Sequence, residues 1–172
     1  MKAFLFDVFG TLVDWRTSVA REAERLLAPL GCKLDWLTFA DAWPDASAGL
    51  KRLKQKFLIA PVSNGNISLM VDLARRNGFP WDAVLGAEVA GDYKPKPRVY
   101  LAACEAFDLP PGECAMVAAH SSDLAAAASC GLRTAHIARP NEAGPGKGEA
   151  APKTKVDLAA SSIEHLAEQL GA

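Results

Sequence analysis

The length, composition and charge of the chain favour one ordinary globular domain and exclude several classes of protein. With 172 residues, half of them hydrophobic and 23% charged, the chain can bury a core without disulfides or metals. Its 19 basic and 20 acidic residues leave a net charge of −1, which gives no electrostatic attraction for nucleic acid or an anionic membrane.

The N-terminus and the cysteines indicate where the protein works. The first apolar run meets Asp7 after six residues, which is too short for a signal peptide or a membrane span. The four cysteines form no CxxC pair and have no metal-ligand spacing with the three histidines, so we expect buried thiols in a reducing compartment. We therefore expect a cytoplasmic protein with neither a membrane nor a nucleic-acid partner.

Apolar runs of strand length alternate with helical patterns along the chain. The sequence predicts strands at 2–9, 57–62, 83–89, 114–119, 133–138 and 156–159. It predicts helices at 15–30, 35–43, 49–56, 66–77, 97–107, 121–130 and 161–170. Residues 141–155 are rich in Gly, Pro, Lys and Glu without periodicity, which indicates a loop. The alternation predicts an α/β fold, a parallel sheet with helices on both faces.

Polar side chains follow four of the predicted strands. Asp7 follows the first strand, and Ser63 and Asn64 follow the second. Lys94 lies in a turn after the third strand, and residues 120–123 follow the fourth. Ligands of open parallel sheets bind beside the carboxyl ends of the strands, so we expect a site at this edge.

The order of these motifs resembles that of the haloacid dehalogenase superfamily: a nucleophilic aspartate, a serine or threonine, a lysine and an acidic residue. Residues 6–16, 58–66 and 93–95 resemble the type II 2-haloacid dehalogenases, and residues 116–124 resemble the fourth motif of one branch of that family. The resemblance covers most of the chain and implies a Rossmann-like core. It also implies hydrolysis of a 2-haloalkanoic acid to a 2-hydroxyalkanoic acid and halide, without a cofactor.

The resemblance gives the catalytic roles to Asp7, Lys94 and Asp123. A carboxylate in a dry crevice can displace halide and form an ester, which makes Asp7 the expected nucleophile. Lys94 would keep Asp7 ionised, since a nearby opposite charge lowers a carboxyl pKa, and Asp123 would position Lys94 and the hydrolytic water. The residues alone also allow a turn-capping carboxylate, a surface lysine and an acidic residue in the first turn of a helix.

Further residues are expected to contact the substrate or the ester. Ser63 and Asn64 can donate hydrogen bonds to the substrate carboxylate or to the departing halide, although Ser63 can equally cap a turn. The backbone amides of Val8 and Phe9 can hold a carbonyl oxygen during ester hydrolysis. Two more candidates, from the first and fourth motifs, are Thr11 and His120. No metal ligands are expected.

Phe9 favours dehalogenation over phosphoryl transfer. Most phosphatases of the superfamily carry a second aspartate two positions after the nucleophile, where it protonates the leaving group. An apolar ring at that position cannot transfer a proton, but it can help to exclude water. The alternative is a phosphatase acting on a small phosphorylated substrate, and only that alternative would require Mg²⁺.

The segment between the first two motifs is short for a type II dehalogenase. Only 56 positions separate Asp7 from Ser63, and Pro44 stands where the resemblance leads us to expect the arginine of a helical cap. We therefore divide the chain into a core, residues 1–13 and 49–172, and a truncated cap remnant, residues 14–48. A further alternative is an impaired, capless protein that acts as a binding module or homodimer through an apolar patch of Trp15, Trp36 and Trp43.

Overall fold

The computed structural model describes residues 1–13, 43–142 and 145–172. These residues form one six-stranded parallel sheet with the order β3-β2-β1-β4-β5-β6. The strands are β1 (Ala3–Phe6), β2 (Leu58–Ser63), β3 (Leu85–Gly86), β4 (Cys114–Ala118), β5 (Arg133–Ile137) and β6 (Leu158–Ala160). The strand order reverses at β1, which lies between β2 and β4. This topology confirms the predicted α/β class.

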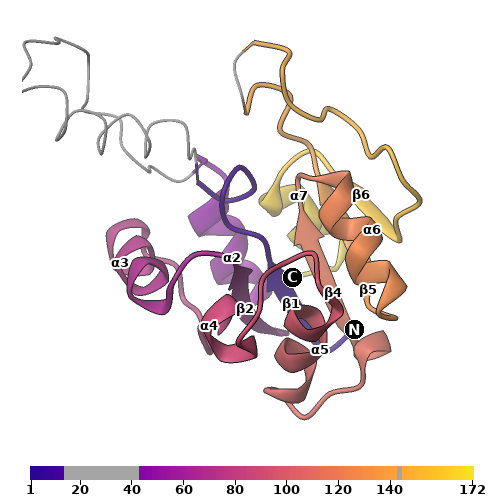
Figure 1. Cartoon of the computed structure of the whole chain (residues 1–172). Helices are drawn as coiled ribbons and strands as arrows, with labels where there is room; N and C mark the ends of the chain where they lie inside the picture. Colours follow the sequence, from indigo (N-terminus) through magenta and orange to yellow (C-terminus); the bar gives the residue numbers. More distant parts are fainter. Residues whose placement is uncertain (14–42, 143–144) are drawn as a thin grey trace, which may run out of the picture.

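Helices cover both faces of the sheet because β1 and its neighbours are apolar on both sides (Figure 1). Phe4 and Phe6 pack with α2 (Ala46–Leu53), α3 (Ile67–Asn77) and α7 (Ile163–Gln169) in one core. Ala3 and Leu5 point to the other core, with α5 (Pro97–Glu105) and α6 (Ser121–Ser129). The remaining described helices are α4 (Ala87–Ala90) and the 3-10 turn η2 (Pro111–Glu113).

The strand predicted at 83–89 is wrong in its second half. Only Leu85 and Gly86 pair with β2, and α4 begins at Ala87. Gly86 has a φ of 123°, and a β-carbon there would lie 2.3 Å from the carbonyl oxygen of Ser63. The glycine therefore lets the chain approach β2 closely and then leave the sheet. Apolarity alone cannot distinguish this turn from a continued strand.

The helix predicted at 49–56 lies three residues earlier, as α2. A β-carbon at Gly49 would lie 2.6 Å from the backbone of Ile163, so the missing side chain lets α2 and α7 pack closely. Ala46 is buried in the core. Residues 46–48, which we assigned to the cap remnant, thus form the first turn of a core helix.

Several sequence-based predictions lie outside the described residues. They include the helix at 15–30, nearly all of the helix at 35–43, and Trp15 and Trp36 of the apolar patch. Trp43 is described: it is half-buried, and its Nε1 donates to the carbonyl oxygen of Gly10 at 3.2 Å. Among the described helices, none has the length and apolarity needed to cross a membrane.

Candidate active site

Five of the predicted site residues converge at the carboxyl edge of the sheet. An open cavity of about 300 Å³ is lined by Asp7, Asn64, Lys94, His120 and Asp123. The rest of its lining is Pro95 and Ser122. The side chains come from the loops after β1 and β2, the turn before α5, the N-cap of α6 and the first turn of α6. The topology, and not closeness in sequence, brings them together.

Asp7 is buried at this strand end and is surrounded by donors. Lys94 Nζ lies 2.8 Å from its Oδ1, while Thr11 Oγ1 lies 2.8 Å and His120 Nδ1 3.3 Å from its Oδ2. Burial by itself would raise the pKa of Asp7, but Lys94 and His120 together hold it well below its usual range. Asp7 is therefore an ionised, largely desolvated carboxylate.

Thr11 holds the Asp7 carboxylate in place through a hydrogen bond. It is fully buried, and its hydroxyl donates to Asp7 while accepting from the backbone N–H of Ala119 at 2.8 Å. The hydroxyl thus links the end of β1 to the end of β4. This arrangement favours a role of Thr11 in holding Asp7, and the direct substrate contact that we predicted for Thr11 stays a prediction.

Lys94 bridges the two carboxylates of the site. Its Nζ lies 2.6 Å from Asp123 Oδ2 as well as 2.8 Å from Asp7. Burial would lower the pKa of Lys94, but Asp7 and Asp123 raise it, so the ammonium stays charged. Asn64 holds the backbone of Lys94 at both polar groups, donating to its carbonyl at 3.2 Å and accepting from its N–H at 2.7 Å.

Asp123 has a second partner that the sequence did not reveal. Its Oδ1 accepts a hydrogen bond from the hydroxyl of Tyr100, which projects from α5. Burial, followed by the neighbouring Asp123, raises the pKa of Tyr100, so the phenol remains a donor. Burial also raises the pKa of Asp123 in spite of Lys94. Tyr100 thus fixes the carboxylate that holds Lys94.

His120 lies between two carboxylates. Its Nδ1 faces Asp7, and its Nε2 lies 2.9 Å and 3.0 Å from the two carboxylate oxygens of Glu142. The hydrogen bonds to Asp7 and Glu142 raise the pKa of His120 to about 10. Glu142 was not predicted, because it belongs to the aperiodic segment after β5. A β-carbon at Gly10 would lie 2.0 Å from Glu142 Oε1, so this glycine makes room for the carboxylate.

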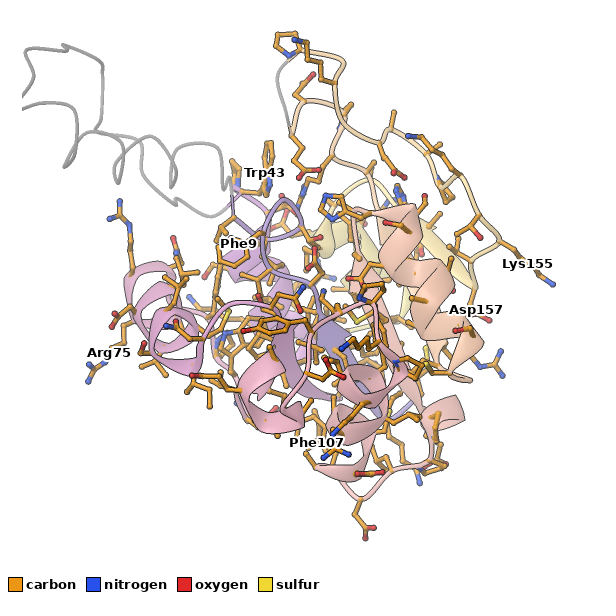
Figure 2. The ribbon with its side chains drawn as sticks, viewed as in Figure 1. Phe9, Trp43, Arg75, Phe107, Lys155 and Asp157 are labelled. Atoms are coloured by element: carbon orange, nitrogen blue, oxygen red, sulfur yellow. The ribbon has the colours of Figure 1, made fainter. Side chains whose placement is uncertain are left out.

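The other predicted site residues lie close to Asp7 but differ in exposure. Ser63 is buried, and its Oγ accepts from the N–H of Gly65 at 3.0 Å, in agreement with the turn-capping alternative. Val8 is buried, whereas Phe9 is half-buried and reaches the turn at Gly65. Figure 2 shows Phe9 near Trp43, above the end of β1. Substrate contacts of Ser63, Val8 and Phe9 stay predictions.

Arg139 is a buried cation beside the site that the sequence analysis missed. Its Nε donates to the carbonyl oxygen of Thr11 at 3.0 Å. Its terminal nitrogens bind both oxygens of Asp45, at 3.0 Å and 2.9 Å, and the guanidinium lies 5.0 Å from the ring centroid of Trp43. Because Asp45 neutralises it, Arg139 does not replace the cap arginine that the resemblance implies.

The acidic, histidine and cysteine side chains of the site are the possible ligands for the Mg²⁺ ion that a phosphatase would need. Within residues 1–13, 43–142 and 145–172, no three acidic, histidine or cysteine side chains form a cluster that could hold an ion. Asp7 and Asp123 are joined by the ammonium of Lys94, which takes the position between them that a cation would need. The described residues therefore do not fit a Mg²⁺ site.

Comparisons with known proteins agree with this arrangement. A family model described as haloacid dehalogenase-like hydrolase matches residues 29–131. The (S)-2-haloacid dehalogenase 4A of Burkholderia cepacia is 32% identical over 193 aligned positions, which include 81% of this chain and 84% of the relative. The 193 aligned positions contain only about 139 residues of this chain, which is 81% of its 172 residues. About 54 aligned positions of that relative therefore have no counterpart here.

Two solved structures are similar over nearly their whole length. The defluorinating L-2-haloacid dehalogenase Rha0230 is 32% identical with a TM-score of 0.90, and the alignment covers 100% of this chain and 96% of that one. The L-2-haloacid dehalogenase PA0810 is 37% identical with a TM-score of 0.85 and 99% coverage of both chains.

Proposed function

This chain belongs to the haloacid dehalogenase-like hydrolases, and we propose that it is a hydrolytic 2-haloacid dehalogenase whose nucleophile is Asp7. The substrate is a 2-haloalkanoic acid, and the products are a 2-hydroxyalkanoic acid and halide. The observation that carries the proposal is the buried Asp7 carboxylate, held ionised by Lys94 and His120 at a cavity. The names of the relatives, all 2-haloacid dehalogenases, support the same reaction.

The first step is a displacement at C2 of the haloacid. A carboxylate oxygen of Asp7 forms a bond to C2, and the carbon–halogen bond breaks with its electron pair leaving on the halide. The small solvent exposure of Asp7, 8%, supports this role, because a desolvated carboxylate is a stronger nucleophile than a hydrated one. The charges of Lys94 and His120 offset those of the substrate carboxylate and the departing halide.

The second step is hydrolysis of the Asp7 ester. Water adds to the carboxyl carbon of Asp7, and the ester bond then breaks to release the hydroxy acid. Val8 and Phe9 directly follow Asp7 in the sequence, and their backbone N–H groups have no acceptor among the described residues. They supply the hydrogen bonds that a developing oxyanion needs. Asp123 acts through Lys94, whose ammonium it holds 2.6 Å away.

Phe9 supports dehalogenation over phosphoryl transfer. A phosphate ester leaves an alkoxide that needs a proton, whereas halide leaves as a stable anion without one. Phe9 offers no proton, and no acidic side chain takes its place in the described lining of the cavity beyond Asp7 and Asp123. Both of those carboxylates are engaged by Lys94.

We also propose that the segment assigned to residues 14–48, apart from residues 46–48 of α2, is a cap shortened relative to the relatives, on a core formed by residues 1–13 and 46–172. The roughly 54 unmatched positions of the Burkholderia cepacia enzyme support a deletion of this size. Two further proposals concern the whole protein. Free Cys104, Cys114 and Cys130 support a cytoplasmic location, and exposed Ile67, Leu69 and Val71 on α3 support a homodimer.

Halide release from 2-chloropropionate tests the nucleophile. The wild-type protein should release chloride, and Asp7→Asn should release it at least about 1,000-fold more slowly, because a neutral amide cannot displace halide. Asp108→Asn, the same change at an exposed position, should keep the wild-type rate. Chloride release that persists in Asp7→Asn would contradict the proposed nucleophile.

A further inference from the structure

We propose that His120, oriented by Glu142, is the base that activates water for hydrolysis of the Asp7 ester. This inference rests on the proposed function and assigns one step of it to a pair of residues. It begins from the unusual position of His120, whose two ring nitrogens each face a carboxylate. One carboxylate, Asp7, is consumed in the first step of the reaction. The other, Glu142, is not.

Glu142 sets the proton position that a base requires. Its carboxylate can only accept a hydrogen bond from Nε2, so the proton of neutral His120 stays on Nε2. The lone pair is then on Nδ1, the nitrogen 3.3 Å from Asp7 Oδ2. From there, one water molecule can reach both Nδ1 and the carboxyl carbon of Asp7. Glu142 is thus a positioning residue, and His120 is the catalytic one.

Asp123 is less suited to remove a proton from this water. Its Oδ2 accepts from Lys94, and its Oδ1 accepts from the Tyr100 hydroxyl. A proton on Asp123 would weaken the contact that holds the Lys94 ammonium against Asp7. His120, by contrast, has 36% of its side chain exposed and lines the cavity, so water can reach it.

Esterification of Asp7 changes the charge around His120. In the resting protein, Asp7 and Glu142 keep the imidazolium protonated. The ester removes the negative charge of Asp7, which lowers the pKa of His120 and lets the proton pass to solvent. Within the described part of the chain, the other charged or titratable groups on elements packed around His120 are Lys94, Asp123, His136 of β5, Arg139 and Glu149. None of them gains or loses charge in the first step.

The step is balanced in atoms and protons. Neutral His120 takes one proton from water at Nδ1, and the hydroxide oxygen bonds to the carboxyl carbon of Asp7. The tetrahedral intermediate then breaks the bond between that carbon and the oxygen attached to C2 of the product. The remaining hydroxyl proton passes to this leaving oxygen and yields the hydroxy acid. Asp7 is again a carboxylate and His120 an imidazolium, as in the resting protein.

The split between halide release and ester hydrolysis tests the role of His120. With excess 2-chloropropionate, His120→Gln should still release about one chloride per active site, because the displacement needs no base, although the burst should be slower than in the wild type because the imidazolium charge beside Asp7 is gone. Steady-state turnover should then fall by at least about 100-fold. Intact mass spectrometry of the quenched protein should show one propanoate adduct. Wild-type turnover in His120→Gln, or a slower burst without adduct, would overturn the inference.

The pH profile tests Glu142 separately. The hydrolysis rate of the wild-type ester should rise with pH as His120 loses its proton. Glu142→Gln removes a negative neighbour, so this rise should move by about one pH unit or more to lower pH, with a lower plateau. Glu149→Gln, the same change in the same loop, should leave the rise in place. If Glu142→Gln lowers the hydrolysis rate but does not change the pH at which this rate rises, Glu142 has only a structural role and its assignment is overturned.

The wild-type protein separates this inference from the proposed function. If the wild type releases no chloride and forms no adduct, the proposed function fails, and the inference fails with it. If the wild type turns over and Asp7→Asn does not, the proposed function stands. In that case, the variants His120→Gln and Glu142→Gln test only whether His120 is the base and whether Glu142 orients it.

Discussion

Lys94 determines the charge state of the whole site. It is the ammonium between Asp7 and Asp123, which lie on either side of its Nζ at 2.8 Å and 2.6 Å. Without it, two buried carboxylates would share the site with no cation between them. Burial and the mutual repulsion of the carboxylates would then favour protonation. Asp7 would then lose its negative charge without any change in its position.

We therefore expect Lys94→Met to reduce the chloride burst by at least about 100-fold at pH 7. In the wild type the pKa of Asp7 lies below its usual range, so activity should persist at acidic pH. In the variant that pKa rises, and the remaining activity should increase with pH in the neutral range. The pH dependence of the burst measures both effects.

Lys96→Met is the matched control for this prediction. Lys96 is two residues away, its side chain is 67% exposed, and it pairs with Asp92 outside the cavity. It should keep both the wild-type burst and the wild-type pH profile. An unshifted pH profile in Lys94→Met would show that Lys94 does not control the ionisation of Asp7.

The site residues that follow a strand could be predicted from the sequence. Asp7 and Asp123 stand next to apolar runs, and parallel topology brings such positions to one edge. Tyr100 and Glu142 could not be found in this way. Tyr100 lies inside a helical pattern beside core residues, where an aromatic ring is expected for packing alone. Glu142 reaches His120 through a loop whose path no local pattern determines.

At the scale of elements, the sequence predicted buried strands better than short turns. The buried strand β4 differs from its prediction by a single residue, since a continuous apolar run needs two covered faces. The strand predicted at 83–89 failed because the backbone conformation of Gly86, and not hydrophobicity, ends β3. Helix α2 was shifted because Gly49 is an interior packing position, whereas the sequence pattern suggested a helix start.

Arg139 joins elements that are far apart in the sequence. It follows β5, binds the carbonyl of Thr11 and forms a bidentate pair with Asp45 before α2. The same Asp45 accepts from the backbone N–H of Ile163 at 2.7 Å, at the start of α7. The pair therefore connects the end of the sheet with two helices of one face. Its side chains are only 6% and 14% exposed.

Arg139→Leu should lower the free energy of unfolding by about 3 kcal/mol, because it leaves the Asp45 carboxylate buried without its cation. Arg133→Leu removes an exposed pair with Asp157 and should cost less than about 1 kcal/mol. Urea denaturation of both variants measures the difference. Equal losses would show that burial does not distinguish the two ion pairs.

At the scale of the whole molecule, the described site is built by the core alone. Its side chains come from the loops after β1, β2 and β5, from α5 and α6, and from the turns before these helices, between Asp7 and Glu142. A shorter segment between Asp7 and Ser63 leaves these contacts intact. The described core therefore supplies both the proposed nucleophile Asp7 and the cations that hold it ionised.

The charge network of the site also couples stability to pH. The pKa of His120 is raised from an ordinary 6.5 to about 10. A raised pKa means that the folded state binds the proton more tightly, so the stabilisation is complete below about pH 6.5 and disappears as the pH rises to about 10. Asp7, with a lowered pKa, contributes in the opposite sense and loses its contribution in acid.

We therefore expect the stability advantage of the wild type over His120→Gln to be largest near pH 6 and to shrink steadily toward pH 10. Urea denaturation at pH 6, 8 and 10 measures this difference. In Glu142→Gln the pKa of His120 should be raised less, because one of its two carboxylate partners is gone. The stabilisation by His120 should therefore disappear at a lower pH in that variant. A constant difference across this range would contradict the folded-state protonation of His120. Ester hydrolysis needs neutral His120, and loss of the Asp7 charge in the ester lowers the pKa of His120, so hydrolysis should accelerate at a lower pH than the one at which this stabilisation is lost.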